Sequence, residues 1–442
     1  MPPSDHRLPG HALSRLASGG GGADAVRHLA APQRSKRLLN VVGTMRLAVE
    51  AGHPHARVAE HAYDVLAQIE KKSPAAVRGT LAHPAVGAWA VRAVRSLEED
   101  GTSPDGPGDP ARLGAVAAAA ALKSGMPCEV QVPVSGGTIM LPSLGRLELG
   151  DAQDDVLADL VVRADGRVEA GELCLRPGAG EQRGWRPLRR LETADAGLRV
   201  LVDDLDVFRW SDTAEVGGRL REPELQTWRA SLDAAWTMLR AHHWTIAEET
   251  QALVTVLTPI KGPAQGMNSA SSGDLFGTIG MSTPPDGRWL ASTFAHEVQH
   301  GKLNAIQDVV RLLEPDESDE PNRFYAPWRP DPRPLSGLLQ GAYAYLGVSG
   351  FWRRQRAHES DLRPHIEFAH WREAAHLVTG TLLDSGLLTT EGERFVGAMR
   401  RTLTPWLSEP VPPAALEIAR QEAEAHLSTW QAANGSAPVH RL

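Results

Sequence analysis

The feature that most constrains this 442-residue chain is the stretch Ser292–Gln307, which reads STFAHEVQHGKLNAIQ. Apolar side chains recur there every four to five residues, which predicts an amphipathic helix: Leu290, Phe294, Val298 and Leu303. Within it, His296, Glu297 and His300 form an H-E-x-x-H motif. On a helix, histidines at i and i+4 lie on one face, a turn apart. Both imidazoles can then bind one metal ion, with Glu297 beside it.

An extended segment and a turn precede this helix, which is the order of elements in zincin folds. The run Asp274–Ser282 predicts an edge strand that ends at Met281, and a turn follows at Pro284–Gly287. An edge strand beside a metal can accept a peptide as one more strand. With 17 histidines, a random chain of this composition would contain the motif about 0.04 times. We therefore predict a metal site; the alternative is an ordinary helix with two surface histidines.

The motif alone leaves the metal and the reaction open. With zinc and a third protein ligand, Glu297 would be the general base that activates a metal-bound water for peptide hydrolysis. With Fe(II) and open coordination positions, two histidines and one further ligand can bind a keto acid and dioxygen. A non-enzymatic alternative is a helical scaffold that binds peptides through a degenerate site, but the intact motif argues against it.

The third metal ligand is predicted to come from another helix. The metzincin spacing would place it six residues after His300, and that residue is Ile306, which cannot bind a metal. The helix that follows carries Gln340, whose carbonyl oxygen is our candidate ligand. A peptidase would instead need a remote acid such as Glu359 or Glu367.

A proline-rich loop, Phe324–Pro334, lies between these two helices and reads FYAPWRPDPRP. Its four prolines exclude a helix interior and favour a rigid extended loop. The loop carries Arg329 and Arg333, and a planar guanidinium is suited to hold a carboxylate through two parallel hydrogen bonds. The alternative is a structural loop whose arginines pair with acids elsewhere.

Charge and hydropathy exclude several other classes. The net charge is −8, and the 46 Lys and Arg residues are dispersed among 54 Asp and Glu, without the basic stripe of a nucleic-acid-binding protein. The longest apolar run, Leu113–Leu122, is much shorter than a membrane span. Residues 1–10 lack the apolar core of a signal peptide, and two cysteines cannot form a disulfide framework. We expect a cytoplasmic protein that uses neither a membrane nor nucleic acid.

Several stretches resemble the HExxH-motif peptide-modification proteins, also called 2-oxoglutarate-dependent HExxH-type peptide β-hydroxylases. They are HEVQHGKLNAIQDVVRLL, FYAPWRPDPRPLSGLLQGAYAYLGVSGFW, HRLPGHALSRLASGGGG and RSKRLL. The resemblance runs over most of the chain. It implies a reaction of Fe(II), 2-oxoglutarate and O2 that hydroxylates the β-carbon of a residue in a ribosomally synthesised precursor peptide. The resemblance makes His296 and His300 the iron ligands. For the distal carboxylate of 2-oxoglutarate, Arg329 and Arg333 are our own candidates, because a planar guanidinium matches a carboxylate. The Irving–Williams order favours zinc in the protein as purified.

The distribution of patterns predicts an α+β fold with three parts. Residues 1–110 form a helical region that ends in a Gly/Pro/Asp-rich linker, and residues 111–221 form a strand-rich middle segment. Residues 222–442 form a mainly helical, zincin-like metal-binding catalytic domain, in which Thr250–Ile260 is predicted to be a buried strand.

Overall fold

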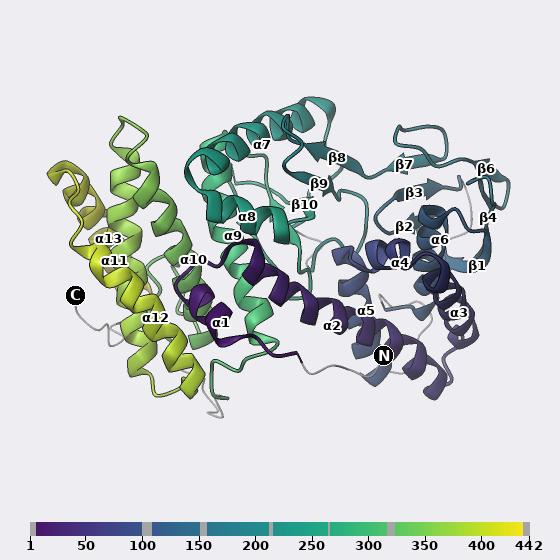
Figure 1. Cartoon of the computed structure of the whole chain (residues 1–442), viewed down its shortest axis with the longest axis horizontal. Coiled ribbons are helices and arrows are strands. Elements are labelled where there is room, and N and C mark those ends of the chain that lie inside the picture. The colour runs from purple at the N-terminus through teal and green to yellow at the C-terminus, as the bar shows by residue number, and fades with distance from the viewer. Residues whose placement is uncertain are drawn as a thin grey trace. The chain divides into compact units, whose positions relative to one another are not determined.

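The predicted α+β class is confirmed by a computed structural model of the chain (Figure 1). The structure describes residues 6–99, 108–150, 157–211, 215–263, 266–315 and 323–435. This part of the chain contains thirteen α-helices and three β-sheets. None of its helices is long and apolar enough to cross a membrane.

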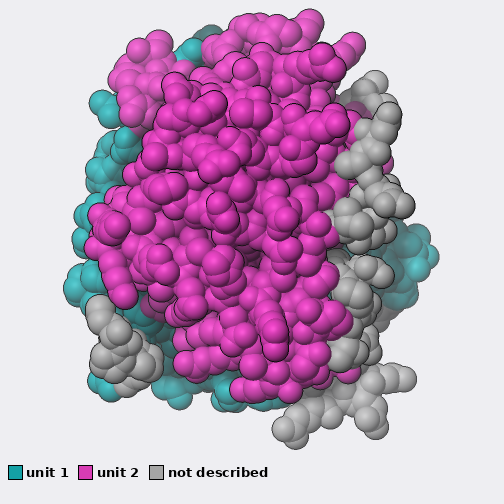
Figure 2. Space-filling model, turned by 90° about the vertical axis from the view of Figure 1, so that its right-hand side faces the viewer, with its two compact units in different colours: residues 1–32, 230–253, 284–442 teal, residues 33–229, 254–283 magenta. Residues whose placement is uncertain are grey.

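The chain divides into two compact units, coloured separately in Figure 2. Unit 1 contains residues 1–32, 230–253 and 284–442, and unit 2 contains residues 33–229 and 254–283. These bounds differ from the predicted boundaries at residues 110 and 221. The reason is packing: helix α3 (Ala56–Lys72) packs on α6 (Leu113–Ser124) and strand β1 (Cys128–Pro133), so the early helices and the strand-rich segment share one core. Part of the predicted linker lies outside the described residues.

Among the described residues of unit 1, the regular secondary-structure elements are all helices, which are joined by loops. Two helices, α2 (Gly22–Glu50) and α7 (Glu222–His242), have one end in unit 1 and the other end in unit 2. The helices wholly inside unit 1 are α1 (Gly10–Ala17), α8 (Trp244–Leu253), α9 (Gly287–Gln307), α10 (Leu335–Gln355), α11 (Arg363–Asp384), α12 (Thr390–Leu407) and α13 (Pro413–Asn434). The zincin-like arrangement stays a prediction.

Helix α9 carries the H-E-x-x-H motif and starts five residues before the predicted stretch. Asp286 caps it, because its carboxylate accepts a hydrogen bond from the backbone N–H of Trp289 at 2.8 Å. The predicted apolar face is buried, including Phe294 and Val298. Helix α10 packs against α9, and α11 packs against α10. The motif therefore lies on a fixed helix inside a helical bundle.

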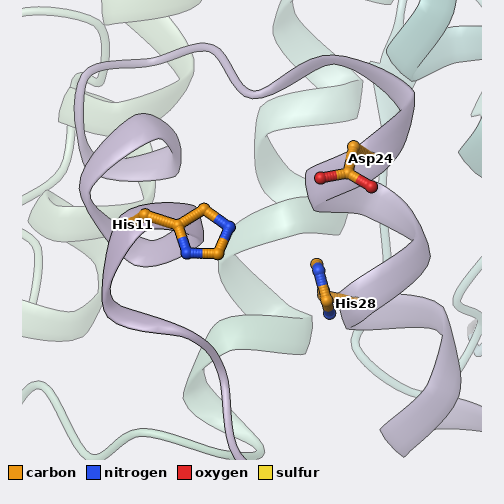
Figure 3. A group of neighbouring side chains, drawn as sticks. All are labelled: His11, Asp24 and His28. Atoms are coloured by element: carbon orange, nitrogen blue, oxygen red, sulfur yellow. The ribbon is translucent and has the colours of Figure 1, made fainter.

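The N-terminal helix α1 and the start of α2 form a hairpin. Gly19 and Gly22 adopt positive φ angles of 84° and 67°, which glycine tolerates without strain and which let the chain reverse between the helices. Figure 3 shows this hairpin with the side chains of His11, Asp24 and His28 directed toward one another. These three residues match no motif that was recognised in the sequence.

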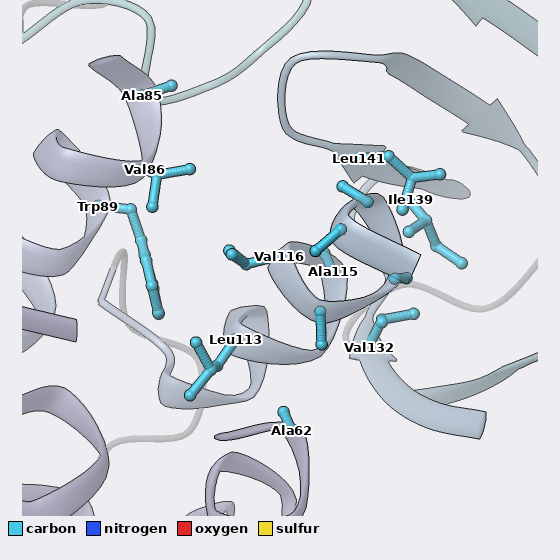
Figure 4. Packing of buried hydrophobic residues seen from close by; sticks show 14 of the residues in the cluster. Ala62, Ala85, Val86, Trp89, Leu113, Ala115, Val116, Val132, Ile139 and Leu141 are labelled. Atoms are coloured by element: carbon cyan, nitrogen blue, oxygen red, sulfur yellow. The ribbon is translucent and has the colours of Figure 1, made fainter. Parts of the chain in front are cut away.

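Unit 2 is built around α6, whose alanine-rich sequence is buried on all sides (Figure 4). Small side chains allow close approach: a Cβ added at Gly114 would lie 2.0 Å from the carbonyl oxygen of Gln131. The apolar run read from the sequence is therefore a core helix. The remaining helices of this unit are α4 (Pro74–Leu81) and α5 (Pro84–Glu99), with a short 3-10 turn at Pro110–Arg112.

Three sheets complete unit 2. The first has the order β1-β4-β5-β6, with β4 (Leu157–Val162), β5 (Val168–Ala170) and β6 (Leu173–Leu175). The second has the order β2-β3-β7, with β2 (Thr138–Leu141), β3 (Gly145–Glu148) and β7 (Trp185–Pro187). The third has the order β11-β12-β10-β9-β8, with β8 (Arg189–Glu192), β9 (Arg199–Val202), β10 (Val256–Pro259), β11 (Ser269–Ala270) and β12 (Thr278–Met281).

Two strand predictions in this region were wrong in part. The predicted strand Thr250–Ile260 is divided, because α8 continues to Leu253 and only Val256–Pro259 is extended. The predicted edge strand is internal: β12 pairs with β10 on one side and with the two-residue strand β11 on the other. The chain reverses between β11 and β12, so that β11 covers the outer edge of β12. The residue pattern along one strand does not reveal which segment pairs with it.

Candidate metal centre

The two histidines of the motif direct the same ring nitrogen at a common point. The Nε2 atoms of His296 and His300 lie 3.1 Å apart. With metal–nitrogen bonds of about 2.05 Å, ligand nitrogens are separated by about 2.9 Å at a 90° angle and about 3.3 Å at a tetrahedral angle. The observed separation falls between these values, so the pair is spaced to bind one ion.

Gln340 fixes the tautomer of His300. The amide nitrogen of Gln340 donates hydrogen bonds to Asn304 Oδ1 at 2.6 Å and Gln307 Oε1 at 3.1 Å. Its Oε1 therefore accepts from Nδ1 of His300, at 2.9 Å. Since Nδ1 carries the proton, Nε2 presents a lone pair toward His296. The amide holds the ring in the state and direction that a metal requires.

This position differs from the one predicted for Gln340. The two nitrogens of an imidazole point in divergent directions, and Gln340 Oε1 lies on the Nδ1 side of His300. As placed, Gln340 orients the His300 ring and does not offer its oxygen to the space between the two Nε2 atoms. Asn304 and Gln307, four and seven residues after His300 on the same helix face, were also missed, although their spacing was visible in the sequence.

The surroundings of His296 favour its neutral form. Burial lowers its pKa to about 4; Glu297 acts in the opposite direction and His300 acts in the same direction. The ring keeps 24% of its side-chain surface exposed, and the edge of Tyr345 contacts it with ring centroids 5.1 Å apart. A neutral, partly accessible imidazole is the form that binds a metal ion.

Glu297 is buried beside this pair, with an exposed fraction of 1%. Its Oε1 lies 4.0 Å from Nε2 of His296. No third histidine, cysteine, aspartate or glutamate in the described part of the chain has a ligand atom within 4.8 Å of both Nε2 atoms. Glu297 therefore lies next to the pair without joining it, the position of a base or of an orienting group.

Three stacked aromatic rings line the His296 side of the centre. Tyr345 stacks on Trp371 at 4.0 Å and on Trp328 at 4.9 Å between centroids. Trp328 lies flat on Gly341, where an added Cβ would meet the indole at 2.2 Å. Burial, with the negative charges of Glu367 and Glu297, raises the pKa of Tyr345 well above its ordinary value, and Arg329 opposes this. The phenol is a proton donor at neutral pH, and no motif in the sequence predicted its place beside His296.

The two arginines of the proline-rich loop share one partner inside the loop. Arg329 Nε donates to Asp331 Oδ1 at 3.0 Å, and Arg333 Nη1 donates to Asp331 Oδ2 at 3.1 Å. Backbone hydrogen bonds of 2.9 Å in both directions between Phe324 and Arg333 close the loop. All three charged side chains are at least one third exposed. The structure thus places two guanidinium groups around one accessible carboxylate.

The remote acids that a peptidase would need have other partners. Glu359 forms an ion pair with Arg288 at 2.7 Å and accepts from Gln355 Nε2 at 2.6 Å. Glu367 accepts from the indole N–H of Trp371 at 2.5 Å and pairs with Arg363. Neither completes a three-residue group with His296 and His300.

A buried ion pair anchors the metal helix to the N-terminal hairpin, within unit 1. Lys302 is fully buried, and its ammonium group lies 2.7 Å from Glu249 Oε2. The other carboxylate oxygen of Glu249 accepts from the N–H of Gly22 at 3.0 Å. The carbonyl of Gly19 accepts from Gln299 Nε2 at 2.8 Å and from Lys302 at 3.3 Å. The two donors flank His300, so the hairpin holds this part of α9 in place.

Comparisons with known proteins add no relative: neither a scan against protein-family models nor a search of curated proteins gives a match.

Proposed function

We propose that the protein is an Fe(II)- and 2-oxoglutarate-dependent oxygenase that hydroxylates the β-carbon of a residue in a ribosomally synthesised precursor peptide. One observation carries the proposal. The centre offers two imidazoles 3.1 Å apart, and no third anionic or imidazole ligand joins them among the described residues. Two histidines with one further ligand leave positions for a chelating keto acid and dioxygen. The sequence resemblance adds the peptide substrate.

When bound, Fe(II) and 2-oxoglutarate supply the oxidising chemistry with O2. The chain's own residues position these groups. His296 and His300 present neutral Nε2 atoms, and Gln340 keeps the second ring from turning. The stacked rings of Trp328, Tyr345 and Trp371 give the centre an aromatic wall on the side where Tyr345 contacts His296.

The proline-rich loop is our candidate for holding the distal carboxylate of 2-oxoglutarate. Exposed ion pairs contribute only about 0–1 kcal/mol, so a ligand carboxylate can replace Asp331 between Arg329 and Arg333 at little cost. The positive charge of Arg329 opposes the rise in the pKa of Tyr345, so this guanidinium acts electrostatically on the ring that contacts His296. If neither Arg329→Lys nor Arg333→Lys weakens the apparent affinity for 2-oxoglutarate, the clamp lies elsewhere.

The second candidate is a zinc metallopeptidase, and the position of Glu297 favours it. A buried carboxylate 4.0 Å from the Nε2 of His296 is placed as a general base for a metal-bound water would be. Removing such a base lowers the rate by about 10²–10⁴-fold. A hydroxylase needs no such base, so Glu297→Gln should retain measurable hydroxylation.

The decisive experiment is mass spectrometry of a precursor peptide encoded beside this protein. Anaerobically reconstituted protein with Fe(II), 2-oxoglutarate and O2 is expected to add one oxygen atom to the peptide. His296→Ala and His300→Ala should abolish this gain, whereas His358→Ala, at a surface histidine that stacks on His242, should not. Cleaved fragments that form with Zn(II) in the absence of O2, and that disappear in Glu297→Gln, would overturn the proposal in favour of the peptidase.

A further inference from the structure

A second cluster of metal-ligating side chains lies on the N-terminal hairpin. His11 comes from α1, and Asp24 and His28 come from the first turns of α2 (Figure 3). One ligand atom from each residue lies within 4.8 Å of the other two. Among the described residues, no other group of three histidines, cysteines or acids meets this condition.

The local fold explains why these three side chains meet. Asp24 and His28 are four residues apart and therefore occupy one face of α2. The turn between the helices brings α1 beside that face, where the His11 ring lies edge-on to His28 with centroids 6.4 Å apart. Helix α1 is held where the carbonyl of Leu16 accepts from the hydroxyl of Tyr343 at 2.7 Å, and α2 is held at its first residue, where the N–H of Gly22 donates to Glu249 at 3.0 Å. The backbone is fixed, while the exposed side chains are able to rotate.

We propose that His11, Asp24 and His28 form a second metal site, for a divalent transition metal such as Zn²⁺. Two imidazoles and one carboxylate suit zinc with a water as fourth ligand, and they disfavour Ca²⁺ and Mg²⁺, which prefer oxygen ligands. Ligand atoms around one zinc ion are about 3.0–3.5 Å apart, so modest side-chain rotations close the set.

One side chain competes with the metal for Asp24. Arg27 Nη2 lies 3.3 Å from Asp24 Oδ1, and both side chains are more than half exposed. Such a pair contributes about 0–1 kcal/mol, so a divalent ion is able to displace the guanidinium. Removing Arg27 should therefore strengthen metal binding.

A metal ion bound by these three residues would link α1 to α2. The turn between them carries the carbonyl of Gly19, which accepts hydrogen bonds from Gln299 and Lys302 on the metal helix. A metal there would stabilise the hairpin and, through it, the support of α9. The site is thus structural in kind and is independent of the proposed oxygenase reaction.

The test is zinc titration by calorimetry on the full chain carrying His296→Ala and His300→Ala, which removes the first pair of ligands. We expect one Zn²⁺ to bind and to raise the melting temperature. Adding His28→Ala or His11→Ala should weaken binding at least about tenfold, because even the outer partners of metal ligands contribute 10–100-fold. His61→Ala, at an exposed histidine of unit 2, is the matched control and should have no effect.

Two results would overturn the proposal. One is no zinc binding by the double variant when circular dichroism shows that it is folded. The other is unchanged affinity after loss of His11 and His28. Arg27→Ala gives an independent check, since it should tighten binding, and weaker binding in that variant would contradict the site. None of these readouts depends on enzymatic activity.

Discussion

The two units bury charged groups in different ways. In unit 1, Lys302 and Glu249 lie 2.7 Å apart, and both also make hydrogen bonds to the backbone of the N-terminal hairpin. In unit 2, His83 and Asp203 are equally buried, but Nε2 of His83 and Oδ2 of Asp203 are 3.7 Å apart. Among the described residues, neither of these atoms has a hydrogen-bond partner.

The difference shows how each buried pair affects the stability of its unit. The pair in unit 1 is satisfied and connects the metal helix to the hairpin, so it fixes the site. The pair in unit 2 leaves polar atoms unsatisfied. Nearby, one guanidinium nitrogen of Arg112 donates to both carboxylate oxygens of Asp206, at 2.7 and 2.8 Å. Unsatisfied buried groups reduce stability and respond to pH. Four measurements test this contrast.

The largest effect is expected for Lys302→Met. The variant leaves the carboxylate of Glu249 buried without its counter-ion, which destabilises a protein by about 3–5 kcal/mol. Urea unfolding gives the change in the free energy of unfolding. In the double variant Lys302→Met/Glu249→Gln, the amide oxygen can still accept from Gly22, and most of the stability should return. A loss below about 1 kcal/mol in the single variant would show that the ion pair does not fix the hairpin.

A pH-dependent effect is expected for Asp203→Asn. Burial, with the charge of Asp206, raises the pKa of Asp203 to about 7. A raised carboxyl pKa means that the folded state favours the protonated form, so wild-type stability falls as pH rises from about 4 to about 7. Asparagine keeps the oxygen that accepts the backbone N–H groups of Leu205 and Asp206. The variant should gain on the wild type over this window, by on the order of 4 kcal/mol.

This pH effect must be separated from that of His83. Burial lowers the pKa of His83 to about 4, which costs stability as pH falls below about 6.5, the opposite direction. Because His83 lies 3.7 Å from Asp203, both proteins are also compared in a His83→Gln background, where the difference between their unfolding free energies isolates Asp203. A difference that stays constant between about pH 4 and pH 8 would contradict the unsatisfied state of this pair.

A smaller effect is expected for Gln340→Ala at the metal centre. The variant removes the acceptor for Nδ1 of His300 and frees the ring to change tautomer or orientation. Loss of such a partner typically lowers metal affinity 10–100-fold. Competition with a chelator measures it, and Gln421→Ala, at a glutamine on the surface of α13, is a matched control. If Gln340→Ala binds the metal as tightly as the wild type, the amide does not orient the ring.

The smallest effect is expected for Asp331→Asn, which contrasts an exposed polar group with the buried ones. Both of its arginine contacts are solvent-exposed, so the free energy of unfolding should change by at most about 1 kcal/mol. The same variant should not weaken binding of 2-oxoglutarate, since it removes the competing carboxylate. A large loss of stability would show that the loop depends on this acid.

Much of the fold could be predicted from the sequence, because periodicity reports local structure. The metal helix, α3 and strand β2 follow directly from apolar spacing and turn residues. The division into units could not be predicted, since it depends on which surfaces meet. The hairpin of residues 10–32 belongs with the metal helix through hydrogen bonds across about 280 residues.

The candidate site shows the same limit. The spacing of His296 and His300 predicts a shared face of one helix, and their Nε2 atoms do converge. Which nitrogen of His300 faces Gln340 depends on how α9 and α10 cross, which no pattern within either helix contains. The contact of Tyr345 with His296 depends on the same crossing. The His11, Asp24 and His28 cluster requires a specific turn between two helices.

The attachment of the hairpin to the metal helix also has a consequence for biosynthesis. Gly19 leaves the ribosome 280 residues before its partner Gln299. At 5–20 residues per second, that interval lasts about 14–56 s. Unit 2 requires only residues up to 283, so its sequence emerges completely before α9 does. Through this time the N-terminal hairpin lacks its partners on α9, so chaperones or a bound metal ion are able to act on it.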